Sequence, residues 1–143
     1  MSTEENKAVV GRWFQAFNER DLAAEEAARS ADFVAHVAGA PAPLNGAMWQ
    51  SFIAAFFTGF PDFRLDLQDV LAEADRVAVR WTFRGTHAGE FQGIGPTGKT
   101  VSMSAVEVNR VADGKVAEHW VVFDQFGLLQ QLGAIPVPGE GGR

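Results

Sequence analysis

The amino-acid sequence predicts an α+β fold in which N-terminal helices pack on one face of a curved antiparallel sheet. Up to Phe60, apolar residues recur at steps of three and four, as on one face of a helix. From Phe63 onward they alternate with polar residues, as in strands that bury one face. Asp113-Gly114, between two alternating runs, is a strong hairpin signal. Two such layers leave room for a cavity between them.

Helices dominate the first part of the chain. The predicted helices span residues 3–18, 22–29 and 49–60, and Pro61 ends the third one. Residues 32–37 show a mixed apolar pattern, and residues 38–46 hold two prolines and two glycines, which indicates a loop.

Strands follow the helices. The first predicted strand runs from residue 63 to a turn at 73–75, and a slip in its alternation at Asp69 and Val70 indicates a bulge. The other predicted strands span residues 77–83, 101–111 and 116–123. A glycine-rich connection over residues 85–99 and a short helix over 126–132 complete the expected order.

Composition and charge limit the classes of function. The 143 residues fit one domain, which we expect to span residues 1–143 with flexible N-terminal residues and a Pro/Gly-rich C-terminal tail. A net charge of -6 argues against a nucleic-acid partner. The lack of cysteine excludes disulfides and thiol chemistry. We find neither a signal-peptide pattern nor the run of about 18 apolar residues of a membrane span, so we expect a cytoplasmic protein without membrane contact.

Glu107 is the first candidate catalytic residue. It lies on the same side of the predicted strand as Val101, Met103, Ala105 and Val111, because side chains at alternate positions point to one face. We therefore expect it on a mainly apolar, inward face. Burial there raises the pKa of a carboxyl group toward the working pH, which suits a general acid or base. The alternative is that the site opens to solvent and Glu107 pairs with an arginine.

Three further residues are catalytic candidates. His87 follows a strand end, where an irregular backbone can aim its ring inward, although a surface position is nearly as consistent with its loop. His119 shares parity with Val121, and Trp120 has the opposite parity, so the alternation leaves open which set faces inward. Asp124, at the end of the last strand, is either a rim residue or the cap of the following helix.

Aromatic residues are the candidates for a ligand pocket, although most of them are equally explained as core. The predicted lining is Trp13, Phe17, Phe52, Phe56, Met103 and Trp120. Such a pocket favours a flat or compact apolar molecule that carries one carbonyl, hydroxyl or ester group. The chain has no tyrosine, so no phenol can donate a hydrogen bond to an oxyanion. No histidine pair has zinc-motif spacing, and we expect no metal.

Seven short motifs resemble the SnoaL-like polyketide cyclase and ester cyclase family, within the ketosteroid-isomerase-like cone superfamily. They are Phe60-Pro61-Asp62, Asp75-Arg76-Val77, Gly85-Thr86-His87, residues 93–99, Asp113-Gly114-Lys115-Val116, Glu118-His119-Trp120 with Asp124, and Gln131-Leu132-Gly133. The resemblance implies a cone-shaped sheet, proton-transfer chemistry without a cofactor, an inward Val121 and a pocket that includes His36. It also implies a homodimer that pairs through the outer face of the sheet.

Two positions depart from the ring-closing members of this family. Their general-base aspartate aligns with Val121 and its partner histidine aligns with Glu107. The carboxylates at Glu107 and Asp124 look more like the ester-cyclase branch. We therefore expect an enzyme that cyclises, isomerises or hydrolyses a small apolar carbonyl compound. The alternatives are a non-catalytic binding protein of this fold and an epoxide hydrolase-like enzyme.

Overall fold

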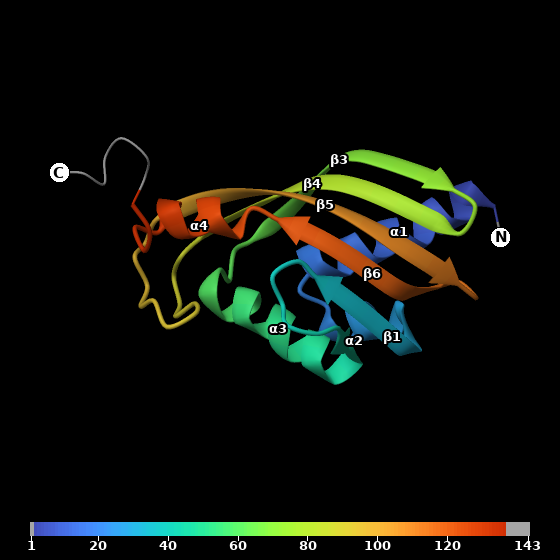
Figure 1. The fold of residues 1–143 in the computed structure, drawn as a ribbon, viewed down its shortest axis with the longest axis horizontal. Helices are drawn as coiled ribbons and strands as arrows, with labels where there is room; N and C mark the ends of the chain where they lie inside the picture. Colours follow the sequence, from blue (N-terminus) through green and yellow to red (C-terminus); the bar gives the residue numbers. More distant parts are fainter. Residues whose placement is uncertain (1, 137–143) are drawn as a thin grey trace.

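The computed structural model describes residues 2–136 and contains four helices and six strands (Figure 1). In chain order these are α1 (Thr3–Asn18), α2 (Leu22–Ala27), β1 (Arg29–Val37), β2 (Leu44–Asn45), α3 (Gly46–Gly59), β3 (Arg64–Glu73), β4 (Arg76–Thr86), β5 (Thr100–Ala112), β6 (Lys115–Phe123) and α4 (Gln125–Gln131). Residues 137–143 of the predicted tail, and Met1, lie outside the described residues. The α+β prediction is confirmed.

Side-chain caps fix where the helices begin. Ser2 and Glu5 form a reciprocal capping box at the start of α1, which places the cap one residue before the predicted helix. Asn45 caps α3 through the backbone N–H of Met48. The second helix ends at Ala27 and not at the predicted Arg29, because Arg29 already belongs to β1. Among residues 2–136, no helix is long and apolar enough to span a membrane.

The six strands form one sheet in the order β2-β1-β6-β5-β4-β3. The register shifts between Leu67 and Asp69 in β3, which confirms the predicted bulge. The β5–β6 hairpin turns at Asp113-Gly114, where both residues have positive φ, of 51° and 74°. The expectation of a fully antiparallel sheet is wrong at one place, because β1 pairs in parallel with β6. The mixed pattern before the loop gave no sign of that pairing.

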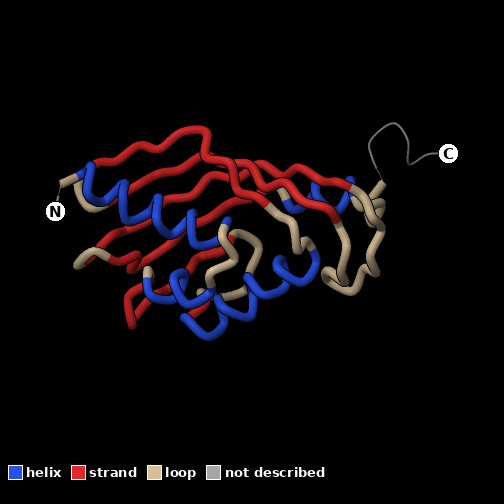
Figure 2. Tube along the Cα trace, turned by 180° about the vertical axis from the view of Figure 1, so that it is seen from behind, coloured by secondary structure: helices blue, strands red, loops and turns tan. Residues whose placement is uncertain are grey.

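The helices α1, α2 and α3 cover one face of the curved sheet, as the view from behind shows (Figure 2). The buried side chains of β4, β5 and β6 alternate along each strand and face these helices. The connection between β4 and β5 folds back onto the end of α3, where the backbone N–H groups of Ala88 and Gly89 donate to the Gly59 carbonyl. This connection thereby packs against the C-terminal end of α3.

Candidate active site

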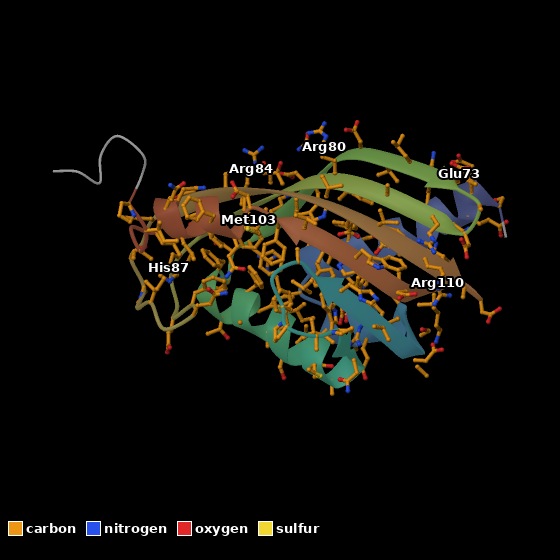
Figure 3. All side chains as sticks on the ribbon, in the orientation of Figure 1. Glu73, Arg80, Arg84, His87, Met103 and Arg110 are labelled. Atoms are coloured by element: carbon orange, nitrogen blue, oxygen red, sulfur yellow. The ribbon has the colours of Figure 1, made fainter. Side chains whose placement is uncertain are left out.

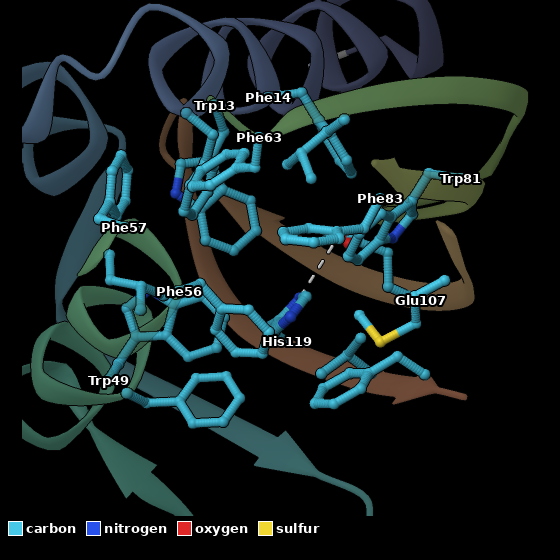
Figure 4. Close-up of a pocket in the computed structure, with 17 residues that line it drawn as sticks. Trp13, Phe14, Trp49, Phe56, Phe57, Phe63, Trp81, Phe83, Glu107 and His119 are labelled. Carbon is cyan, nitrogen blue, oxygen red and sulfur yellow. Dashed lines mark ion pairs between the residues drawn. The ribbon is translucent and has the colours of Figure 1, made fainter. Parts of the chain in front are cut away.

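An aromatic cavity lies between the helical layer and the inner face of the sheet (Figure 4). Its space is about 600 Å³, including solvent at its mouth. The lining residues are Trp13, Phe14, Phe17, Trp49, Phe52, Ile53, Phe56, Phe57, Phe63, Leu65, Trp81, Phe83, Met103, Glu107, His119, Val121 and Phe123. Glu107 and His119 are the only ionisable side chains in this lining, so its chemistry depends on these two groups.

Glu107 projects from β5 into the cavity, as its parity predicted. It lies opposite Val79 of β4 and Val121 of β6 and is only 3% exposed. Loss of solvent raises the pKa of Glu107 to about 8, although the hydrogen bond from Asn109 and the nearby indole N–H of Trp81 act in the opposite direction. No arginine of residues 2–136 forms an ion pair with Glu107, so the alternative of a solvent-open salt bridge is not what the structure shows.

His119 faces Glu107 from the neighbouring strand β6, which settles the strand parity that the alternation left open. Its Nδ1 atom lies 2.7 Å from Oδ1 of Asn109 and 3.7 Å from Oε2 of Glu107. Burial, and to a smaller extent the charge of His36, lowers the pKa of His119 to about 3, so the ring is neutral. Figure 4 shows the two side chains directed toward one another.

Asn109 holds these two side chains together. Its Nδ2 donates to Glu107 Oε2 at 2.6 Å, and its Oδ1 accepts from His119. This assignment of the amide follows from the Val77 carbonyl, an acceptor 3.5 Å from Nδ2. His119 therefore carries its proton on Nδ1, and Nε2 keeps its lone pair. Asn109 was missing from the sequence candidates, although its position two residues beyond Glu107 places it on the same face.

A buried ion pair anchors the wall of the cavity beside His119. Glu25 of α2 accepts from Arg29 at 2.9 and 3.1 Å, and from the indole N–H groups of Trp13 at 2.9 Å and Trp49 at 3.1 Å. Both indoles meet the His119 ring edge to face, with centroids 5.1 Å away. Glu25 and Arg29 were not among the residues predicted from the sequence. Their spacing of four residues was the available signal.

Six residues predicted to bind a substrate line the cavity. They are Trp13, Phe17, Phe52, Phe56, Met103 and Val121. Periodicity identified the helices and strands that carry them, and the family resemblance indicated the inward direction of Val121. Their contact with a substrate remains a prediction.

Two predicted lining residues, His36 and Trp120, lie on the other face of the sheet, and their placement in the pocket was wrong. Their rings stack on each other with centroids 5.3 Å apart, and His36 Nε2 lies 2.7 Å from Glu118 Oε2. The cause is strand parity, because His36 and Trp120 are paired neighbours in β1 and β6 and share the outward direction.

His87 and Asp124 also do not line this cavity. His87 is fully buried in the connection after β4, where its Nδ1 accepts from the Thr97 backbone N–H at 3.2 Å (Figure 3). Asp124 caps α4 by accepting from the Gly127 N–H at 2.9 Å, which is the structural alternative considered for it. Among residues 2–136, no three His, Asp or Glu side chains are grouped as metal ligands would be.

Comparisons with known proteins agree with this architecture. The family model of the SnoaL-like polyketide cyclases matches residues 7–132. A curated relative, the aklanonic acid methyl ester cyclase AcmA of Streptomyces galilaeus, is 34% identical over 70 residues, which span 49% of each chain. This match therefore covers about half the length of that relative.

Solved structures match over nearly the whole chain. AclR of Streptomyces galilaeus, a proposed hydroxylase, is 38% identical with a TM-score of 0.88, and the match covers 94% of this chain and 100% of AclR. IdmH of Streptomyces antibioticus, a proposed polyketide cyclase, is 32% identical with a TM-score of 0.81, and the match covers 90% of this chain and 98% of IdmH. Together with the family match, these likenesses show that the chain belongs to the SnoaL-like polyketide cyclase family.

Proposed function

We propose that this protein is an enzyme that transfers a proton at a carbon next to the carbonyl group of a small apolar compound, as in a cyclisation. The proposal depends on the environment of Glu107. Its carboxyl group lies in an aromatic cavity with a pKa of about 8, and Asn109 connects it to the neutral His119 through hydrogen bonds. A base works best when its pKa lies near the working pH.

Glu107 performs the proton transfer in this proposal. At pH 7 about a tenth of it is ionised, given its pKa of about 8. The carboxylate takes the proton of the α C–H bond, and the electron pair of that bond forms the enolate. The enolate carbon then bonds to a second carbonyl carbon of the same molecule, and Glu107 returns the proton to the new alkoxide. The product is an isomer of the substrate, so the electrons balance without an oxidant.

His119 orients the substrate. Its Nδ1–H is engaged by Asn109, so Nε2 is the ring atom that accepts a hydrogen bond from an enol or hydroxyl group. Trp13 and Trp49 each meet this ring edge to face and restrict its rotation. This arrangement selects a substrate that is mostly apolar and carries few polar groups.

Hydrogen–deuterium exchange tests the proposal. The protein is incubated in D₂O with 1-tetralone, an apolar bicyclic ketone, and deuterium uptake at the α carbon is followed by mass spectrometry. Aklanonic acid methyl ester, the compound in the name of AcmA, is assayed for conversion to an isomer. We expect Glu107→Gln to slow exchange by about 100-fold or more. Glu73→Gln, at an exposed carboxylate of β3, is the matched control and stays at the wild-type rate.

The binding alternative gives a different result. Wild-type protein that is thermally stabilised by both compounds, and yet exchanges deuterium no faster than buffer, would be a binding protein. Nucleotides and sugar phosphates that stabilise the protein when apolar carbonyl compounds do not would contradict the assignment of the pocket itself.

Hydroxylation is a second candidate, favoured by the 38% identity to AclR. It inserts an oxygen atom and needs dioxygen and a reductant, so its product gains about 16 Da relative to the substrate, whereas cyclisation leaves the mass unchanged. Mass spectrometry of the same reaction mixtures, with and without NADPH and air, separates the two candidates.

A further inference from the structure

The indole N–H of Trp81 is a buried hydrogen-bond donor without an acceptor. Trp81 lines the cavity from β4, and among residues 2–136 its Nε1 has no hydrogen-bond partner. A buried N–H without an acceptor is rare in folded proteins, because it has lost water without compensation. The position of this donor in the lining indicates that a ligand supplies the acceptor.

The other side-chain N–H donors of the lining are occupied. The indoles of Trp13 and Trp49 donate to Glu25, and His119 donates from Nδ1 to Asn109. The chain has no tyrosine that could take this role. Trp81 is therefore the lining side chain with a free N–H within the described part of the chain.

Trp81 is also a diagonal neighbour of Glu107. In the antiparallel β4–β5 pair Trp81 lies opposite Ala105, and Glu107 lies two residues further along β5, on the same face. A diagonal pair of this kind is within reach for a long aromatic side chain. Figure 4 shows the Trp81 nitrogen directed toward the side of the Glu107 carboxyl group.

We propose that Trp81 is a catalytic residue whose indole N–H donates a hydrogen bond to the substrate oxygen that becomes negatively charged in the reaction. The inference rests on the proposed function. When Glu107 takes the α proton, the C–H electron pair forms the carbon–carbon double bond and the carbonyl π pair moves onto oxygen. The carbonyl oxygen is bonded to the carbon next to the α carbon. When the α carbon lies at Glu107, this oxygen therefore comes close to a donor beside Glu107. A fixed donor aimed at such an oxygen stabilises the transition state more than the ketone.

NMR of the indole groups tests the contact without turnover. The four tryptophans give four indole ¹H–¹⁵N signals, and the Trp81 signal is the one absent from Trp81→Phe. We expect 2-naphthol, whose oxyanion resembles an enolate, to move the Trp81 proton signal downfield, and naphthalene to leave it nearly in place. The proposal is overturned if 2-naphthol shifts the Met103 methyl signal and not the Trp81 indole, or if 2-naphthol does not bind at all.

Kinetics tests the role of the donor in the reaction. We expect Trp81→Phe to lower kcat for deuterium exchange of 1-tetralone by about 100-fold, with KM changed by less than about threefold, as for a donor used mainly in the transition state. Trp120→Phe, the same change on the outer face of the sheet, is the matched control and keeps wild-type kcat. Replacement of Trp81 by 3-benzothienylalanine retains the bicyclic shape without the N–H, and we expect it to be as slow as Trp81→Phe.

The two tests separate the inference from the function on which it rests. A wild-type protein that exchanges no deuterium contradicts the proposed function, and the naphthol titration then still decides whether Trp81 holds an oxyanion. An active protein in which the benzothienyl variant and Trp120→Phe are equally fast contradicts the role of Trp81 alone.

Discussion

Burial acts on Glu107 and His119 in opposite directions, and it leaves both side chains uncharged near neutral pH. The pKa of the carboxyl group rises to about 8 and that of the imidazole falls to about 3, because an apolar wall disfavours the charged form of each. Asn109 can bridge them because its amide offers both a donor and an acceptor. The site thus holds a carboxyl group that is mostly protonated at neutral pH and ionises as the pH rises through about 8.

The raised pKa of Glu107 predicts that stability falls from pH 6.5 to 8. The folded carboxyl group keeps its proton up to about pH 8, whereas the unfolded one loses it near the ordinary value of 4.5. The resulting stabilisation is complete below 4.5 and lost as the pH rises through 8. His119 acts oppositely, and its stabilisation is lost as the pH falls from 6.5 toward 3. Above pH 6.5 the slope therefore comes from Glu107, at most about 1.4 kcal/mol per pH unit.

Urea unfolding of the wild type and Glu107→Gln at pH 6.5, 7.2 and 8 measures this slope. We expect the variant to lack the decline, since an amide does not titrate, and to be the more stable of the two at pH 8. Glu73→Gln, at an exposed carboxylate, is the control that keeps the wild-type decline. Equal slopes in the wild type and Glu107→Gln would show that Glu107 is ionised in the folded protein.

Strand parity explains which site residues the sequence could reveal. Alternation along β5 identified Glu107 as inward, and the same rule on β6 left His119 and Trp120 as alternatives until the neighbouring strands were known. The same alternation also places Asn109 on the inward face. It was not predicted as a site residue, because its amide side chain carries no charge. The free N–H of Trp81 could not be recognised, because it depends on which acceptors the other indoles find across the fold.

At the scale of secondary structure, the short helix α2 connects three other elements through a single side chain. Glu25 accepts hydrogen bonds from Trp13 of α1, Trp49 of α3 and Arg29 of β1. All four residues are buried. Six residues form too short a helix to be stable by themselves. We infer that tertiary bonds of Glu25 hold α2 in place and with it the aromatic wall around His119.

Glu25→Ala is expected to lower the free energy of unfolding by about 3–5 kcal/mol, because it leaves the Arg29 guanidinium buried without its partner. Glu26→Ala, the exposed neighbour on the same helix, should change stability by less than about 0.5 kcal/mol. Denaturant unfolding followed by tryptophan fluorescence measures both. The double change Glu25→Met with Arg29→Met should be less harmful than Glu25→Ala. A loss below about 1 kcal/mol in Glu25→Ala would contradict the anchoring role.

The boundaries of the elements were predictable where the signal was local. The helix over residues 3–18, the bulge in β3 and the Asp113-Gly114 turn each depend on neighbours in the sequence, and all three are confirmed. The parallel pairing of β1 with β6 was not predictable, since it joins strands that are separated by most of the chain. That pairing also places His36 and Trp120 side by side on one face of the sheet, a contact that local alternation could not show.

At the scale of the whole molecule, the outer face of the sheet carries an apolar stripe. Val106 and Val122 are directly paired in β5 and β6, with 51% and 63% of their surfaces exposed. Leu71 of β3 is 68% exposed. It is paired with Ala78 of β4, which is paired with Val108 of β5, and Val108 is paired with Trp120 of β6. Ion pairs of Arg80 with Asp69 at 2.6 Å and of Arg84 with Asp66 at 3.0 Å border this stripe.

The apolar stripe predicts a homodimer that pairs through the outer face. An apolar core with a polar rim is the usual composition of such an interface, and contact between two copies removes the exposed valines from water. We expect the wild type to sediment at micromolar concentration with twice the 15.5 kDa mass of the chain. Val106→Lys with Val122→Lys places like charges across the two-fold axis and should give a monomer. Ala54→Lys with Ala55→Lys, at exposed positions of α3 on the helical side, adds the same charge and should leave the dimer intact. A wild-type monomer, or loss of the dimer in both lysine variants, would contradict this interface.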